Sequence, residues 1–180
     1  GATSFNKPLN NWNVSNVTAM NDMFYSASNF NQPLNTWDVS SVTNMTEMFK
    51  EATSFNQPIG NWDVSSVSST RDMFRSASAF NQDLNSWIVS KVTDMYAMFS
   101  EASAFNQDLN SWVVSSVTDM SYMFVDTTNF NPTIGLDSWT VSNVKKMQYM
   151  FHKSGYNKPL NAWDVSSVTD MDAMFSEASA

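Results

Sequence analysis

One phrase of 25 residues is repeated along the whole chain, and this repetition restricts what the chain can fold into. Residues 30–49 read FNQPLNTWDVSSVTNMTEMF, and residues 105–124 read FNQDLNSWVVSSVTDMSYMF. Fixed periods of about 20–50 residues are typical of repeat proteins, in which each unit buries its apolar side against its neighbours. We therefore expect residues 1–180 to form a single repeat array, with units starting near Phe5, Phe30, Phe55, Phe80, Phe105, Phe130 and Tyr156.

The large apolar residues keep to fixed positions of the repeat. All 13 phenylalanines and all 13 methionines lie in repeated positions, which favours a core over a flexible, methionine-rich binding groove. The tryptophans also recur, and we expect them to form a buried structural core: Trp12, Trp37, Trp62, Trp87, Trp112, Trp139 and Trp163.

Two local patterns within each unit predict two elements. The stretch FNQPLN is short and predicts a brief strand that stacks in parallel on the next copy. Val17, Met20, Phe24 and Ala27 follow the spacing of one face of a short helix, and Ser116 with Asp119 has the spacing of a helix cap.

The expected fold class is therefore an α/β repeat solenoid: a leucine-rich-repeat-like horseshoe of seven units of about 25 residues, each a short parallel strand plus a short helix. Strands pack about 4.8 Å apart and helices about 8–10 Å apart, so the strand side should be concave and the helix side convex.

The sixth unit is irregular. It carries two extra residues before Trp139, which we assign to Gly135 and Leu136 and expect to bulge out of the turn. Lys145 and Lys146 stand in the first turn of the expected helix, where cations oppose the helix dipole.

The phrase WDVSSVTDMxxMFxxA, which recurs along residues 1–180, is similar to the repeat of BspA-like leucine-rich-repeat surface proteins, the 25- or 26-residue bacterial surface and mycoplasma-lipoprotein type. The resemblance implies a leucine-rich-repeat-like fold, exposure on the cell surface, and a role in adhesion or partner binding. It implies no catalytic residues.

Composition excludes several classes of function. The chain has 17 acidic against 9 basic residues, which disfavours nucleic acid and anionic membrane surfaces as partners. There is no cysteine, and no apolar run approaches the roughly 20 residues that span a bilayer. The single histidine, His152, is expected to face solvent and not to act as a general base. We therefore expect no catalytic residue, no cofactor and no enzymatic activity.

Pairs of aspartates at one position of adjacent copies raise the alternative of structural calcium, which prefers oxygen ligands. The pairs are Asp38 with Asp63, Asp94 with Asp119, and Asp83 with Asp108. No acidic position persists through all seven units, so turn and helix capping explains most of these acids.

Amide side chains form the most regular polar feature. An unbroken asparagine column, from Asn6 to Asn157, predicts a hydrogen-bonded ladder between copies. A second strip of amides is the candidate binding site for a sugar chain or an extended peptide: Gln32, Gln57, Gln82, Gln107, Asn35, Asn85 and Asn110. Gly60 interrupts this second asparagine column and predicts a turn with positive φ.

The leading hypothesis is a non-enzymatic extracellular or cell-surface array for adhesion or partner binding. Its partner would be a host or neighbouring-cell protein or glycan. The alternative is a filament or stalk subunit that assembles head to tail with further copies of itself, because the last residues run in phase into the first. The same phase, and the missing initiator methionine, indicate a fragment of a longer chain. A third hypothesis, ice or mineral binding, rests on the threonine column that includes Thr18, Thr43 and Thr118.

Overall fold

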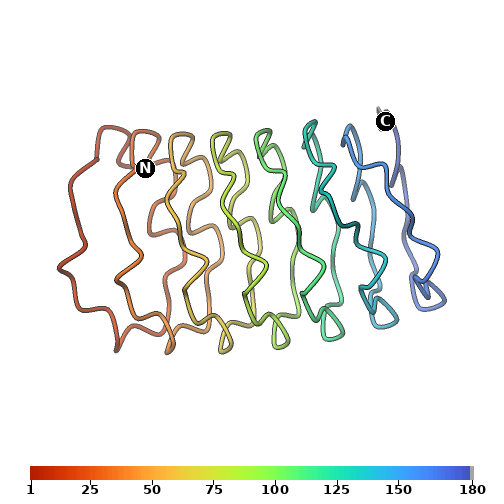
Figure 1. Ribbon diagram of the computed structural model, residues 1–180, viewed down its shortest axis with the longest axis horizontal. Coiled ribbons are helices and arrows are strands. Elements are labelled where there is room, and N and C mark those ends of the chain that lie inside the picture. The colour runs from red at the N-terminus through yellow and green to blue at the C-terminus, as the bar shows by residue number, and fades with distance from the viewer. Residues whose placement is uncertain (179–180) are drawn as a thin grey trace.

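The computed structural model describes residues 1–178 and shows one coil of chain for each sequence repeat. The coils stand side by side along the long axis of the molecule, from the N-terminal to the C-terminal end (Figure 1). We number them coils 1 to 7, and they comprise residues 5–29, 30–54, 55–79, 80–104, 105–129, 130–155 and 156–178.

The expected secondary structure is wrong. Residues 1–178 contain no helix, and extended pairing is limited to isolated parallel bridges with one residue in each coil. The bridges are Ala19↔Asn44, Asn44↔Ser69, Ser69↔Asp94, Asp94↔Asp119, Asp119↔Lys146 and Lys146↔Asp170. The chain is therefore a stack of turn-built coils with no sheet, and neither the α/β solenoid nor the leucine-rich-repeat horseshoe describes it.

Each segment expected to be a helix is instead a series of three overlapping turns. In coil 1, the amide of Met23 donates to the carbonyl of Met20, and the amide of Ala27 donates to the carbonyl of Phe24. The amides of Asp22, Phe24 and Ser26 alternate with these and pair with the next coil; for example, Phe24 N–H donates to Met48 O at 2.9 Å. Successive turns bring every third residue inside, as a short helix does, so the apolar spacing fits both structures. Without a helix, the dipole argument against Lys145 and Lys146 does not apply.

The segment expected to be a strand pairs through side chains. The amide of Asn31 donates to Oδ1 of Asn6 at 3.0 Å, and the same bond recurs between successive coils up to Asn157 and Asn131 at 3.2 Å. The predicted asparagine ladder is therefore present. Because side-chain oxygens take the amides that strand pairing would use, and proline at Pro33 and Pro58 has no N–H, no backbone ladder forms here.

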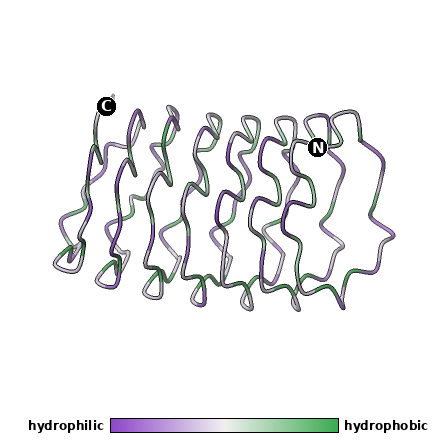
Figure 2. Ribbon diagram, turned by 180° about the vertical axis from the view of Figure 1, so that it is seen from behind, coloured by the Kyte–Doolittle hydropathy of each residue, from purple (hydrophilic) through white to green (hydrophobic). Residues whose placement is uncertain are grey.

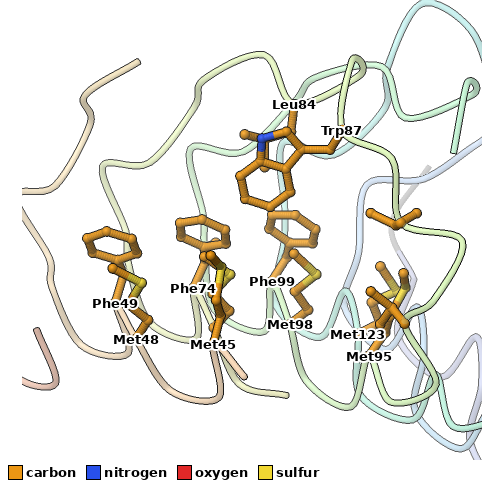
Figure 3. Close-up of a cluster of buried hydrophobic side chains, with 14 of the residues drawn as sticks. Met45, Met48, Phe49, Phe74, Leu84, Trp87, Met95, Met98, Phe99 and Met123 are labelled. Atoms are coloured by element: carbon orange, nitrogen blue, oxygen red, sulfur yellow. The ribbon is translucent and has the colours of Figure 1, made fainter. Parts of the chain in front are cut away.

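Phenylalanine columns form the centre of the core. Phe49, Phe74 and Phe99 lie in a row with methionines beside them (Figure 3), and their ring centroids are 5.6 Å apart. A second column, which includes Phe55 and Phe80, is spaced at 6.0 Å. Hydrophobic and hydrophilic residues recur at matching places from coil to coil (Figure 2).

Tryptophan couples each coil to the one before it. The indole nitrogen of Trp87 donates to the carbonyl of Ile59 at 3.1 Å, and equivalent bonds run from Trp37 through Trp163. Five tryptophans are buried: Trp37, Trp62, Trp87, Trp112 and Trp139. At the ends of the array, Trp163 is half-buried and Trp12 is 55% exposed. Each buried tryptophan therefore satisfies a carbonyl of the preceding coil while filling the core.

Ring spacing explains the absence of a horseshoe. Rings stack 5.3–5.8 Å apart in the column that begins with Phe24 and 6.3–6.5 Å apart in the measured pairs of the tryptophan column. No side of the coil carries elements that need 8–10 Å, so the large difference in spacing that curves a strand-plus-helix array is missing.

The insertion in coil 6 lies earlier than expected. Leu136 does not bulge: it is fully buried in the aliphatic position, and Ile134 is 52% exposed instead. The amide of Leu136 donates to the hydroxyl of Tyr156 at 2.9 Å. Tyr156 stands where the other coils have phenylalanine, and its hydroxyl gives this buried amide a hydrogen-bond acceptor. The constant spacing of three residues from the aliphatic residue to tryptophan, as in Leu109 and Trp112, identifies Leu136 as the core residue.

Two residues of every coil have positive φ, and none is glycine. They occupy the third and seventh positions of the Met-x-x-Met-Phe-x-x-Ala segment, such as Asp22 at 59° and Ser26 at 54°. The positive φ expected at Gly60 is wrong. A side chain there would bring Cβ to 2.5 Å from the carbonyl oxygen of Asp83, so Gly60 permits close backbone approach.

Replacing Trp87 with alanine should lower the free energy of unfolding by about 3–5 kcal/mol, because a buried aromatic side chain and the donor to Ile59 are both lost. Trp12→Ala is the control and should cost less than about 1 kcal/mol, since Trp12 is largely exposed. Urea unfolding followed by circular dichroism measures both, and equal losses would contradict the coupling role.

Asp126→Gly should raise the free energy of unfolding by up to about 1 kcal/mol, because glycine adopts the φ of 54° at this position without steric cost. Asp126→Val should destabilise the protein, since a β-branched side chain is strained there. Thr128→Gly, at an exposed position without positive φ, is the control and should cost about 0.5–1 kcal/mol. Thermal unfolding of the three variants checks the predicted order.

Candidate binding face

The glutamines of the expected binding strip are used within the protein. The side-chain nitrogens of Gln32, Gln57, Gln82 and Gln107 each donate to an asparagine Oδ1 of the preceding coil at 2.8–2.9 Å. All four side chains are half-buried. These amides therefore hold adjacent coils together, and only part of their hydrogen-bonding capacity faces solvent.

The asparagines of the strip differ from one another. Asn85 donates to Oδ1 of Asn110 at 3.2 Å, and Oδ1 of Asn85 accepts the amide of Ser111. Asn35 is exposed, and its backbone carbonyl accepts the side chain of Asn61. The structure thus brings Asn85 and Asn110 together and leaves Asn35 apart from them.

The paired aspartates act as turn caps. Asp38 Oδ1 accepts from the amide and hydroxyl of Ser40 at 3.1 and 2.6 Å. Asp63, Asp94, Asp119 and Asp83 likewise accept the amide two residues later. Asp108 differs, because its Oδ1 accepts the amide of Ile134 in the next coil. Within residues 1–178, no group of three or more metal-ligating side chains is assembled.

The threonine column is also engaged internally. Thr43 Oγ1 donates to the carbonyl of Thr18 at 3.2 Å, and Thr118 does the same to Thr93 at 3.1 Å. These hydroxyls lie beside single bridged residues and not along a continuous sheet. Their donors are therefore occupied by neighbouring coils, which leaves the ice-binding hypothesis without support from this column.

Sequence variation between the coils is concentrated on one side of the stack, which we call the turn face. It consists of the second, third, sixth and seventh residues of each Met-x-x-Met-Phe-x-x-Ala segment. These segments are residues 20–27, 45–52, 70–77, 95–102, 120–127, 147–154 and 171–178. The turns hold these residues through backbone hydrogen bonds, so side chains can change there with little effect on packing.

The turn face collects the side chains most common in protein interfaces. It carries both arginines of the chain, its single histidine and four of its five tyrosines. They are Arg71, Arg75, His152, Tyr25, Tyr96, Tyr122 and Tyr149. Tyrosine and arginine are enriched in interfaces because they combine a large contact area with hydrogen-bonding groups.

Three tyrosines form a cluster in coils 4 to 6. The ring centroids of Tyr96 and Tyr122 are 5.3 Å apart, and those of Tyr122 and Tyr149 are 5.0 Å apart. Tyr122 and Tyr149 hold their rings at φ of 62° and 57°, a region that bulky side chains rarely adopt. The same position has positive φ in every coil, so what distinguishes coils 5 and 6 is the bulky ring that stands there.

A network of charges borders the tyrosine cluster on coils 3 and 4. The Arg71 guanidinium lies 3.8 Å from the centre of the Tyr96 ring and 3.5 Å from Asp94. Arg75 contacts Asp72 and Glu101 at 3.4 and 3.8 Å. The arginines are thus fixed by acids and an aromatic ring, which keeps this border rigid and nearly neutral.

Burial shifts two pKa values on this face. Burial raises the pKa of Asp72 above its usual 3.8, although Lys50, Arg75 and Arg71 act against the shift. Burial, with the neighbouring Tyr96 and Tyr149, raises the pKa of Tyr122. The Tyr122 hydroxyl therefore stays protonated at neutral pH and can donate a hydrogen bond.

A cavity of about 310 Å³ opens between the charged border and the tyrosines, and Arg75, Tyr96, Ser100, Glu101 and Tyr122 are among its lining residues. It offers a positive group, a carboxylate and two aromatic rings within one hollow. Such a hollow can receive a polar side chain of a partner.

His152 does not face solvent as expected. It is half-buried, its ring meets that of Tyr149 edge-on at 5.5 Å, and its Nδ1 is buried without a partner. It therefore packs at the edge of the tyrosine cluster, and no acid or nucleophile within residues 1–178 pairs with it.

Sequence reasoning missed the turn face because the expected helix placed these residues on a convex, solvated surface. The available signal was the contrast between positions: Asn21, Thr46, Arg71 and Tyr96 share one position, whereas tryptophan never changes at its own. Positions that vary within a fixed repeat mark the surface where such proteins bind.

Comparison with known families identifies one match. A family model described as "Mycoplasma protein of unknown function, DUF285" matches residues 1–112 and 93–180, two overlapping stretches that together cover the chain. No curated protein and no solved structure matches the chain. Among the described residues, no helix is long and apolar enough to cross a membrane.

Asp72→Asn should change how stability depends on pH. Between 3.8 and the raised pKa of Asp72, the folded protein binds more protons than the unfolded one, so the wild type loses stability as pH rises. The variant lacks this loss, and its stability relative to wild type should therefore increase with pH across that window. Urea unfolding at intervals from pH 3 to 7 measures the difference.

Asp38→Asn supplies the opposite control. Hydrogen bonds from Ser40 lower the pKa of Asp38, so its stabilising contribution is present above 3.8 and is lost as pH falls through the lowered value. The wild type should lose stability relative to this variant in acid. Equal slopes for the two variants would contradict the assignment.

Proposed function

The chain belongs to the DUF285 family of Mycoplasma repeat proteins, and from this premise we propose that it is a non-enzymatic array that binds a partner through its turn face. The partner is a protein or glycan of a host or neighbouring cell. The similarity of its repeat to that of BspA-like surface proteins supports exposure at the cell surface, although the leucine-rich-repeat fold of those proteins does not carry over.

One observation carries the proposal: the tyrosine cluster of coils 4 to 6 lies on the turn face, where side chains differ from coil to coil. Interfaces concentrate binding energy in a few central aromatic residues surrounded by a polar border. Tyr96, Tyr122 and Tyr149 have the character of such a centre, and the arginines and acids of coils 3 and 4 have the character of the border.

Backbone strain supports the same assignment. Other coils place Asp22, Glu47 or Ala97 at the position of Tyr122, so the turn does not require an aromatic residue there. A bulky ring at positive φ costs stability, of order 1–3 kcal/mol. Every coil has positive φ at this position, but only coils 5 and 6 place an aromatic ring there, so the rings are best explained by a role outside the fold.

The absence of enzymatic activity belongs to the proposal too. The turn face brings together hydrogen-bonding and aromatic groups, and its single histidine packs against Tyr149. Side chains of this kind recognise a surface by shape and hydrogen bonding.

The double variant Tyr122→Ala/Tyr149→Ala should abolish attachment while the fold persists. Alanine already occupies this position in coils 4 and 7, as Ala97 and Ala173, so the turns tolerate it. Loss of two central aromatic contacts should weaken binding by about 2 kcal/mol or more for each. Beads coated with wild type or variant, applied to host-cell monolayers and to immobilised glycans, measure attachment.

Asp22→Ala is the matched control, because it changes the same position in coil 1, away from the tyrosine cluster of coils 4 to 6. It should leave attachment unchanged. Circular dichroism establishes that all three proteins are folded. Undiminished attachment by the double variant would refute the turn face as the binding site.

A further inference from the structure

Three large apolar side chains in the middle of the array are exposed, and they lie on three successive coils. Ile88, Val113 and Ile134 are 61%, 57% and 52% exposed, in coils 4, 5 and 6. The other large apolar side chains with comparable exposure belong to coils 1 and 7. An apolar group confined to the middle of the stack is therefore a local feature and not an effect of the ends.

Ile88 and Val113 replace a residue that stabilises the turn. At the same position, Asp38, Asp63 and Asp164 accept the amide of the serine two residues later at 3.0–3.1 Å. Coils 4 and 5 lose this acceptor and gain an exposed β-branched side chain. Both changes oppose folding and solubility, so the fold does not explain them.

The two residues form one patch, which we call the corner patch. Trp87 and Trp112, which precede them, stack 6.5 Å apart with ring planes within 3° of parallel. Ile88 and Val113 thus project from equivalent positions on consecutive coils and lie side by side. They lie outside the Met-x-x-Met-Phe-x-x-Ala segments, so the corner patch is separate from the turn face.

Two grooves lie along the same part of the stack, and the first of them includes Ile88 of the patch. One, of about 370 Å³, is lined by Gly60, Asp63, Ser65, Ser86 and Ile88. The other, of about 680 Å³, is lined by residues that include Asn110, Ile134, Asp137, Lys158 and Pro159. The grooves and the patch together span coils 3 to 7 along the edge where each coil turns through its tryptophan.

Acidic groups predominate beside this edge. Asp83 and Asp108 stand in coils 4 and 5 where coils 1 to 3 have proline, and Asp63 and Asp137 line the grooves. The cations nearby are Lys91 and Lys158, which leaves four acids against two bases. The chain as a whole has a net charge of −8. A partner that fits this edge therefore carries positive charge together with apolar side chains.

We propose that the corner patch and its two grooves bind an extended, basic polypeptide segment with aliphatic side chains. The aliphatic side chains pack on Ile88 and Val113, and the basic side chains face the aspartates along the edge. The footprint is long and narrow because it follows one position of successive coils, which suits an extended chain better than a folded domain. This site is additional to the turn face and does not depend on it.

The test uses the whole chain and fluorescein-labelled peptides of 12 residues, measured by fluorescence anisotropy. The probe alternates lysine and leucine, and the two control peptides alternate lysine with serine and glutamate with leucine. The wild type should bind the lysine–leucine peptide at least about tenfold more tightly than either control, because both charge and apolar contact are needed.

The decisive variant is Ile88→Asp/Val113→Asp, which restores the residue that coils 2, 3 and 7 have at this position. It should weaken binding of the lysine–leucine peptide at least about tenfold, although two added negative charges would strengthen a purely electrostatic interaction. Its thermal midpoint should be equal to or above that of the wild type, because the turn caps return. Thr140→Asp, which adds a charge at the same position of coil 6 without removing an apolar side chain, should retain binding.

Several results would overturn the proposal. They are failure of the wild type to bind the lysine–leucine peptide, equal binding of that peptide and the lysine–serine peptide, and full binding by Ile88→Asp/Val113→Asp. A wild type that sediments as a dimer, with this variant a monomer, would show that the occupant is a second copy. Tyr122→Ala/Tyr149→Ala should bind the peptide like wild type, so failure here is distinguishable from failure of the turn face.

Discussion

Each coil packs between two near-copies of itself, so one side must complement the other in shape and in hydrogen-bonding groups. The bond from a tryptophan indole to a carbonyl of the preceding coil shows this complementarity most clearly. An indole such as that of Trp87 donates backwards to Ile59 while its ring fills the space between coils. The carbonyl is buried and would be costly to leave unpaired. Because donor and acceptor belong to different repeats, no single coil is stable alone, and the stack folds as neighbours meet.

The sequence predicts what is buried better than how the backbone runs. A period of 25 residues identifies the buried positions and the asparagine ladder without any assumption about secondary structure. The same apolar spacing cannot distinguish a short helix from successive turns, since both bring residues such as Met20 and Met23 to one side. The distinction depends on the amides of Asp22 and Phe24, which pair with the next coil at 3.0 and 2.9 Å.

The candidate sites were harder to predict, because both consist of departures from the repeat. Attention to repeated polar residues leads to Gln57 and Gln82, whose amides hold coils together. The turn face is visible in the sequence as variation, but its meaning depends on knowing that those positions share one surface. Likewise, the sequence shows only that Ile88 stands where other coils have aspartate. The structure adds that the aspartate at this position, such as Asp63, caps a turn.

Two kinds of position in the repeat therefore have different roles: some hold the coils together, and others are free to vary. Side chains that meet their own copies hold the stack and change little, because each change affects the contacts with two neighbouring coils; Tyr156 in place of phenylalanine still stacks on Phe130. Positions on the turn face are held by backbone hydrogen bonds, so they can carry arginine, tyrosine or glutamate. Tyr122 and Tyr149 show how far this freedom extends, since the bonds of the turns keep even strained residues in place. A stack built in this way can vary the side chains of its surface without changing its fold.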